Sequence, residues 1–425
     1  GGKVAMTGVL DFYANGHLEA LASANRGNLV AHGLAPEGIE NNEVLYELVT
    51  DAGWSDRHID VREWLRQYSV NRYGAAPELL MKSWDGLLKS VYGSFTDHPR
   101  FNWQFRPGNV KNGSVNMNAD YFRGLEDFIA ASDQLKESPY YRNDLREMTA
   151  HYLGAKAEIL TKMIDQEYLL GDTLRARSLQ CRFEKLMLGI DRLLAQHPTL
   201  RLDRWVAFAT NAARTEAQRK QYETNARRIV TIWGPPVDDY AARIWSGLVG
   251  DYYLGRWKEY FRGRESGEKV NLAEWERNWV EGSHNGCRQD SGLDVVAFAK
   301  EMLALSKDIS SESLLLNRKD MVGTWSLAVG GQEELRFNIP ARMLSGLKGI
   351  TLERLKGDGE LSCNGYVLEA DGEVVASSSA AITSENGKLH YEISVPAGIR
   401  ANNGCGLTLK LKSQGAAVAG ICLAD

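Results

Sequence analysis

The chain has 425 residues, of which 44% are hydrophobic and 25% are charged, and these values are typical of a globular protein with several domains. Its formal net charge of -5 gives no general attraction for phosphate backbones, which argues against nucleic acid as a partner. The sequence has no uninterrupted apolar stretch of about 18 residues, so we expect no membrane span.

The cysteines indicate neither a disulfide framework nor a zinc site, because they are odd in number and widely spaced. They are Cys181, Cys287, Cys363, Cys405 and Cys422. We interpret them as buried free thiols and expect no metal site. The chain opens at Gly1-Gly2 without a signal peptide and runs directly into structured-looking sequence, so we expect that a natural N-terminus is missing.

Residues 1–66 have the pattern of an α/β protein. A helical pattern over residues 10–25 is followed by an apolar run at 28–35, which is short, compatible with a β-strand and bounded by a glycine and a proline. A second helical pattern begins at Val44. A buried parallel strand needs neighbours on both sides, and we expect these neighbours to lie outside this chain.

Residues 67–317 show a helical pattern with almost no strand signal. Apolar residues recur at spacings of three and four, for example at Leu179, Phe183, Leu186 and Ile190. Breaks are predicted at Ser138-Pro139, Gly171-Asp172, His197-Pro198, Gly234-Pro235-Pro236 and 282–286. We interpret this region as a single all-α helical bundle domain.

The composition changes near Met321, and residues 318–425 contain short segments of alternating polarity such as 335–339. Asp371-Gly372 and Asn386-Gly387 lie between such segments, where hairpin turns are expected. This pattern predicts an all-β sandwich with a jelly-roll-like arrangement.

One acidic residue, Glu37, follows the predicted strand directly. Pro36 cannot continue a strand ladder and Gly38 permits an unusual backbone, so Glu37 is expected to project from the C-terminal end of the strand. In barrels, that end carries the catalytic residues. From the residues alone, a helix N-cap or a solvated surface charge is the commoner interpretation of such a carboxylate.

A set of motifs follows in one order along roughly residues 1–310. They are Leu34-Ala35-Pro36-Glu37-Gly38-Ile39, Asn42-Glu43-Val44, Tyr46, Gly53-Trp54, Trp64, Arg72-Tyr73-Gly74, Ser90-Val91-Tyr92, Arg106-Pro107, Tyr141-Arg142-Asn143-Asp144-Leu145, Thr231-Ile232-Trp233-Gly234-Pro235, Asp239-Tyr240 and Leu248 to Trp257. Together they resemble the α-N-acetylglucosaminidases of glycoside hydrolase family 89. The C-terminal sandwich is not covered by this resemblance.

The resemblance implies a fold and a mechanism. Residues 1–66 would be the C-terminal strand/helix units of a (β/α)8 TIM barrel, with Glu37 as the catalytic nucleophile. The acid/base glutamate would belong to an earlier strand, upstream of this chain. Gly1-Gly2 matches a motif at the end of the preceding strand, while Lys3 replaces the family asparagine, which puts any substrate contact from that position in doubt.

The resemblance also implies substrate contacts outside the barrel. Trp233 would line the sugar pocket, because an indole stacks well on an apolar sugar face; the alternative is a core tryptophan that closes a helix. His98 matches a family loop histidine, which would face the site or simply be exposed. Tyr46 would face the nucleophile or belong to the core.

Three further residues of the matched motifs are interpreted as structural. Arg72 and Arg106 are expected to pair with backbone carbonyls or carboxylates. Asp239 could cap the start of the next helix. We therefore leave these residues out of the predicted catalytic set.

We predict that this chain supplies the nucleophile and the helical pocket wall of a retaining enzyme that removes terminal non-reducing α-linked N-acetylglucosamine. Its partners would be an α-GlcNAc-terminated glycan and an upstream barrel polypeptide, with no cofactor, and the chain alone would be inactive. The resemblance implies a secreted, periplasmic or lysosomal-type compartment. Two alternatives remain: a non-catalytic glycan-binding or assembly protein derived from the enzyme, and a helical scaffold in which Glu37 is structural.

Overall fold

The computed structural model describes most of the chain. The described residues are 6–35, 43–94, 100–108, 115, 117–169, 173–234, 237–282, 292–310, 321–327, 332–339, 347–357, 360–370, 373–396, 405–413 and 417–424. The chain forms two compact units. One consists of Gly1–Lys162 and Arg177–Ser310, and the other of Met163–Ala176 and Ser311–Asp425.

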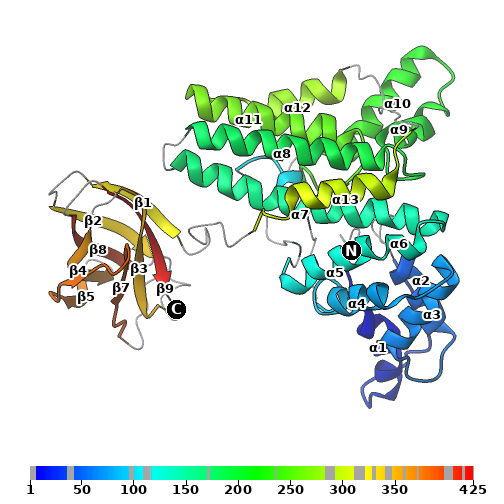
Figure 1. The fold of residues 1–425 in the computed structure, drawn as a ribbon, viewed down its shortest axis with the longest axis horizontal. Coiled ribbons are helices and arrows are strands. Elements are labelled where there is room, and N and C mark those ends of the chain that lie inside the picture. Colours follow the sequence, from blue (N-terminus) through cyan, green and yellow to red (C-terminus); the bar gives the residue numbers. More distant parts are fainter. Residues whose placement is uncertain are drawn as a thin grey trace. The chain divides into compact units, whose positions relative to one another are not determined.

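Helices make up almost all the regular structure of the described chain before Ser310 (Figure 1). They are α1 (Leu10–Ala22), α2 (Glu43–Gly53), α3 (Val61–Tyr73), α4 (Glu78–Leu88), η1 (Asn102–Gln104), α5 (Ala119–Ala130), α6 (Ser132–Leu135), α7 (Pro139–Leu169), α8 (Thr173–Leu194), α9 (Leu202–Thr210), α10 (Glu216–Ile229), η2 (Leu248–Tyr253), α11 (Leu254–Ser266), α12 (Leu272–Glu281) and α13 (Val295–Ser306). The short η1 is a 3-10 helix and η2 is a π-helix.

Local sequence signals set several helix ends. The Asp60 carboxylate accepts the backbone N–H groups of Arg62 and Glu63 and so caps the start of α3. Gly74 ends this helix with φ of 90°, a left-handed conformation that glycine adopts without steric cost. The predicted break before Pro139 is confirmed, because α7 begins at that residue. The helical content predicted from the periodicity is present throughout this region.

The strand expected at residues 28–35 is not formed. The described residues after α1 have no regular structure up to Ala35, and all of them are exposed. Val30 is 91% exposed. A parallel strand is stable only when it is hydrogen-bonded to neighbours and covered on both faces, and the described residues supply no such neighbour to this run. The run is apolar, as a buried strand requires, but its composition alone does not form a strand.

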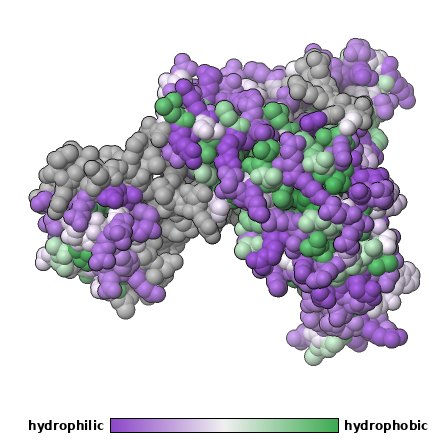
Figure 2. All heavy atoms as spheres, in the orientation of Figure 1, coloured by the Kyte–Doolittle hydropathy of each residue, from purple (hydrophilic) through white to green (hydrophobic). Residues whose placement is uncertain are grey.

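The surface of the helical unit is mainly polar. In Figure 2, hydrophilic residues cover most of its visible face, and hydrophobic residues appear in smaller groups between them. Every described helix is either too short or too polar to span a bilayer. The described residues contain no group of three or more His, Cys, Asp or Glu side chains that could hold a metal ion.

Two antiparallel sheets form most of the second unit. Their strands are β1 (Met321–Leu327), β2 (Gln332–Ile339), β3 (Gly349–Gly357), β4 (Leu361–Ala370), β5 (Glu373–Ser378), β6 (Ile382–Thr383), β7 (Lys388–Glu392), β8 (Cys405–Ser413) and β9 (Ala417–Ala424). The strand order is β1-β9-β3-β7 in one sheet and β2-β8-β4-β5 in the other, where β6 also pairs with β4. Successive strands from β1 to β4 thus alternate between the two sheets.

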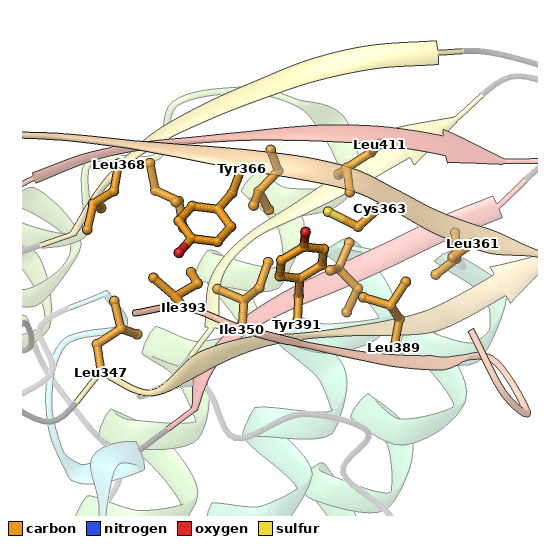
Figure 3. Packing of buried hydrophobic residues seen from close by; sticks show 13 residues of the cluster. Leu347, Ile350, Leu361, Cys363, Tyr366, Leu368, Leu389, Tyr391, Ile393 and Leu411 are labelled. Atoms are coloured by element: carbon orange, nitrogen blue, oxygen red, sulfur yellow. The ribbon is translucent and has the colours of Figure 1, made fainter. Parts of the chain in front are cut away.

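The two sheets share one hydrophobic core (Figure 3). Ile350 of β3 and Tyr391 of β7 come from one sheet, and Leu368 of β4 and Leu409 of β8 come from the other. The exposed and buried residues alternate along β7, as the predicted polarity pattern requires. Cys363 is a buried free thiol as expected, whereas Cys181, which lies on an exposed position of α8, is not buried.

A predicted turn in this unit is confirmed by its backbone angles. Asn386 has φ of 53° and Gly387 has φ of 76°. Two successive positive values define a type I′ turn, which matches the twist of the flanking strands. Glu385 and Lys388 form an antiparallel bridge across it.

Helices α4 and α5 approach each other through two glycines. A Cβ atom at Gly86 would lie 2.7 Å from the backbone oxygen of Asp120, and one at Gly124 would lie 3.0 Å from the backbone oxygen of Ser83. Since both neighbouring atoms belong to the backbone, neither can move without shifting a helix. The absence of side chains at these positions therefore sets the distance between α4 and α5.

We predict that Gly86→Ala lowers the free energy of unfolding by about 1 kcal/mol or more, measured by urea denaturation. The better helix propensity of alanine, worth about 1 kcal/mol, is outweighed by the cost of moving backbone atoms. Gly53→Ala is the matched control, because this exposed helical glycine has only ordinary contacts, 3.9 Å or longer, around an added Cβ. Equal stabilities for the two variants would contradict the close-approach argument.

Candidate active site

Of the four residues predicted to act on substrate, two lie within the part of the chain that the structure describes. Glu37, in 36–42, and His98, in 95–99, lie outside the described residues. Tyr46 lies on α2 and Trp233 in the turn after α10. The structure therefore defines the surroundings of two of the four predicted side chains.

Helix α2 begins at Glu43, six residues after Glu37, and carries Tyr46. Its buried face contains Val44, Leu45 and Leu48, as the periodicity predicted. Tyr46 lies between these positions and is partly exposed, so it is not a fully buried core residue.

Arg72 of α3 connects α2 to the long helix α7. Its guanidinium donates two hydrogen bonds to the Asp144 carboxylate, at 2.7 and 2.9 Å, and the Tyr73 hydroxyl donates a third at 2.6 Å. Glu43 and Glu47 lie 3.5 and 3.9 Å from the same guanidinium. The predicted pairing of Arg72 with carboxylates is confirmed, and the same guanidinium lies beside the first two turns of α2.

Burial and charge act in opposite directions in this cluster. Burial alone would lower the pKa of Arg72, but hydrogen bonds and the charge of Asp144 raise it above its usual value. Burial raises the pKa of Glu47, while Arg72 lowers it. Arg72 therefore carries its charge at any physiological pH.

Trp233 lies in a turn whose backbone conformation is unusual. Its φ is 43°, which is rare for a bulky residue, and its N–H donates to the carbonyl of Arg228 at 2.7 Å. The indole is 43% exposed and makes an edge contact with the Tyr240 ring, with centroids 5.7 Å apart. Trp233 is therefore not a buried core tryptophan, which was the alternative to a pocket position.

Asp239 is not the N-cap that its sequence position suggested. It is buried, has φ of 60°, and its carboxylate accepts hydrogen bonds from the Arg106 backbone N–H and the Arg256 guanidinium. Burial raises the pKa of Asp239, although the adjacent Arg256 lowers it. The tertiary contacts of Asp239 have replaced the local capping role.

Arg256 and Glu276 complete a buried network that the sequence did not reveal. Arg256 donates to Asp239 at 2.9 Å, to Glu276 at 2.8 Å and to the Gln104 carbonyl at 2.9 Å. The Arg106 guanidinium also binds Glu276, at 3.0 Å, as the predicted structural role of Arg106 required. In sequence, Arg256 and Glu276 resemble ordinary charged residues of amphipathic helices, and only their burial distinguishes them.

Comparison with known protein families identifies the family of this chain. The model of the alpha-N-acetylglucosaminidase (NAGLU) C-terminal domain matches residues 64–307, and that of the NAGLU tim-barrel domain matches residues 1–56. This chain belongs to the alpha-N-acetylglucosaminidase family. Human alpha-N-acetylglucosaminidase is 32% identical over 269 residues, which are 61% of this chain and 36% of the human protein.

Solved structures of family 89 glycoside hydrolases from Clostridium perfringens share the fold. A complex with PUGNAc has a TM-score of 0.66 and 24% identity, and the match covers 72% of this family member and 38% of the bacterial chain. A complex with 2-acetamido-1,2-dideoxynojirmycin has a TM-score of 0.66 and 23% identity, over 74% and 38% of the two chains. The chain thus spans little more than a third of the length of these relatives.

We predict that Arg72→Met lowers the free energy of unfolding by about 3 kcal/mol, because the Asp144 carboxylate then stays buried without its main partner. Amide hydrogen exchange of α2 should accelerate as well, since Glu43 and Glu47 lose their cation. Arg62→Met is the control on the same helix, where the pair with Asp85 is exposed and little change is expected. An Arg72 variant as stable as the Arg62 variant would show that the cluster does not hold α2.

Proposed function

We propose that this chain supplies the nucleophile and the helical pocket wall of a retaining glycosidase that removes terminal non-reducing α-linked N-acetylglucosamine. The observation that carries the proposal is the match of residues 1–56 to the barrel model of the family, since this segment contains Glu37. The human relative is named alpha-N-acetylglucosaminidase, and a bacterial relative with two Glu→Gln substitutions is described in complex with its substrate GlcNAc-alpha-1,4-galactose.

The proposed reaction has two displacements. The Glu37 carboxylate attacks the anomeric carbon and forms a covalent glycosyl-enzyme, while a second carboxyl group gives its proton to the leaving oxygen. The second group then takes a proton from water, which attacks the anomeric carbon and releases Glu37. Retention requires the two carboxyl groups to lie about 5 to 5.5 Å apart on opposite sides of the bond. No cofactor takes part in these steps.

The substrate contacts are assigned to three residues. Trp233 would stack on the apolar face of the sugar, and its exposed indole beside Tyr240 supports this role. His98 and Tyr46 would contact the sugar from the loop at 95–99 and from α2. With these contacts the helical region would close one side of a cavity that admits only a chain end, which accounts for exo action.

We further infer a three-part organisation for the chain. Residues 1–66 would belong to the TIM barrel, residues 67–317 to the helical domain and residues 318–425 to a jelly-roll-like sandwich. The barrel would be completed by upstream polypeptide that carries the acid/base glutamate, because a complete (β/α)8 barrel takes about 250 residues. A secreted, periplasmic or lysosomal-type compartment would suit a glycan substrate.

Replacing the nucleophile tests the proposal most directly. In a polypeptide that carries the whole barrel, Glu37→Gln should reduce hydrolysis of 4-nitrophenyl α-GlcNAc by about a thousandfold or more while the fold stays intact. The amide keeps the shape of the carboxylate but is no nucleophile. A folded variant that kept about a tenth of the activity would rule out Glu37 in this role.

The indole is tested by inhibitor binding. Trp233→Ala should weaken binding of 2-acetamido-1,2-dideoxynojirmycin by about 1 to 3 kcal/mol if the ring stacks on the sugar. Trp54→Ala is the control, because this side chain is 94% exposed and has no proposed contact with substrate. Equal affinities for the wild type and a folded Trp233 variant, measured by calorimetry, would remove Trp233 from the pocket.

The proposed active site takes its nucleophile from this chain and its acid/base glutamate from upstream polypeptide, which gives a separate prediction. The 425-residue chain assayed alone should not hydrolyse 4-nitrophenyl α-GlcNAc, because a retaining site needs two carboxyl groups and only Glu37 is assigned to these residues. Clear turnover that Glu37→Gln abolishes would place the second carboxyl group within this chain.

A further inference from the structure

We propose that Asp239 is a positioning residue that holds the turn of Trp233 and Tyr240 in the conformation that presents the indole to the sugar. The inference rests on the proposed role of Trp233 in substrate binding. Asp239 would act through the turn, not by touching substrate. Its carboxylate lies at the junction of three segments: the turn itself, the segment around Arg106, and α11.

The turn needs external support because its backbone is strained at two points. Trp233 has φ of 43° and Asp239 has φ of 60°, and neither residue is glycine. Such conformations cost free energy and persist only where the surrounding structure enforces them. Strained residues cluster at functional sites, and here one of the two is the predicted sugar-binding residue.

Asp239 supplies hydrogen bonds in two directions. Its backbone N–H donates to the Thr231 carbonyl at 2.9 Å, which closes the turn. Its carboxylate accepts from the Arg106 N–H at 2.9 Å and from Arg256 Nη1 at 2.9 and 3.0 Å. Asp239 is only 3% exposed, so these bonds compete little with water.

The partner of Asp239 is itself fixed. The Arg256 guanidinium is completely buried, lies 4.8 Å from the centroid of the Tyr252 ring and also binds Glu276 of α12. Two guanidinium groups, from Arg106 and Arg256, thus face the carboxylates of Asp239 and Glu276, and Asp238 adds a third carboxylate 3.3 Å from Arg106. Each positive charge therefore has an acidic partner. Asp239 is thereby hydrogen-bonded to Arg256 of α11 and, through Arg256, connected to Glu276 of α12.

A second hydrogen bond fixes the residue that contacts Trp233. Arg100 donates to the Tyr240 carbonyl at 3.0 Å, and the Tyr240 ring makes the edge contact with the indole. Arg100 and Arg106 belong to one segment, which also contains η1. The indole, its aromatic neighbour and the buried network are therefore connected through short, directional contacts.

Stability alone does not account for a buried ion network. Replacing such a network by apolar residues of similar volume is often neutral or stabilising, because removing charges from water is costly. Directional bonds to Arg256 set the position of the Asp239 backbone more narrowly than apolar packing would. A positioning role explains both the burial of these charges and the strained turn beside them.

The first experiment measures the turn without reference to catalysis. In the 425-residue chain, Asp239→Asn should accelerate amide hydrogen exchange at positions 233 and 239 by about tenfold, because the charge that Arg256 binds is removed. Exchange in α8 should not change. Asp191→Asn is the matched control, because this partly buried carboxylate accepts the N–H groups of Gly247 and Gly250, which lie outside the turn of Trp233. Unchanged exchange in the Asp239 variant overturns the proposal.

The second experiment measures inhibitor affinity in the polypeptide with the whole barrel. Asp239→Asn should weaken binding of 2-acetamido-1,2-dideoxynojirmycin by about tenfold, and the double variant with Trp233→Ala should bind no more weakly than Trp233→Ala alone. Additive losses would overturn the proposal, because Asp239 would then act independently of the indole. If Trp233→Ala itself has no effect, the substrate-binding role of Trp233 fails, while the exchange result still decides whether Asp239 holds the turn.

A second variant covers the case in which Asp239→Asn does not fold. Arg256→Lys keeps the positive charge, but a single ammonium group cannot reproduce the planar arrangement that reaches Asp239, Glu276 and the Gln104 carbonyl together. It should increase exchange of the turn and weaken inhibitor binding in the same way. Wild-type exchange and affinity in this variant would overturn the proposal.

Discussion

Burial of the Arg256 guanidinium is the constraint on which the candidate site of the helical unit depends. A fully buried charge is tolerated only where acceptors surround it, and here they come from Asp239, Glu276 and the Gln104 carbonyl. Because these acceptors belong to different segments, the turn after α10, the helix α12 and η1 must meet at one point. Displacing any of them would leave charge without a partner in a medium where that is costly.

The apolar run at 28–35, unlike the Arg256 guanidinium, lacks the partners that it needs in the described part of the chain. Its composition favours a strand, but a strand is completed by hydrogen bonds that other strands supply. The described residues give it none, and Val30 remains almost wholly exposed. A helix satisfies its own backbone, so α1 and α2 on either side form from local information. This difference explains why, within residues 1–66, the two predicted helices are present and the predicted strand is not.

The sequence predicted features that are set by neighbouring residues. Pro139 begins α7 because proline is tolerated in a first helical turn, and Asn386-Gly387 forms the expected turn because both residues accept positive φ. The buried network could not be found in this way, since Arg256 and Glu276 lie 20 residues apart on helices with many exposed charges. Asp239 illustrates the limit: its type and position suit a cap, but its partners are distant in sequence. Trp233 was identified by family resemblance and not by periodicity.

Strain, exposure and buried charge occur together around one turn, and each is unfavourable when considered separately. A positive φ at an aromatic residue, an indole that is 43% exposed and an ion network removed from water would each be avoided if stability were the only requirement. Stacking on a sugar depends on the orientation of a ring, and free rotation of that ring would have to be lost on binding. The hydrogen bonds between Asp239 and Arg256 restrain the backbone of the turn during folding, and the Tyr240 ring lies against the indole. The cost is then met by the folding of α11 and α12, where the Tyr252 ring of η2 lies against both the Arg256 guanidinium and the Trp279 ring of α12.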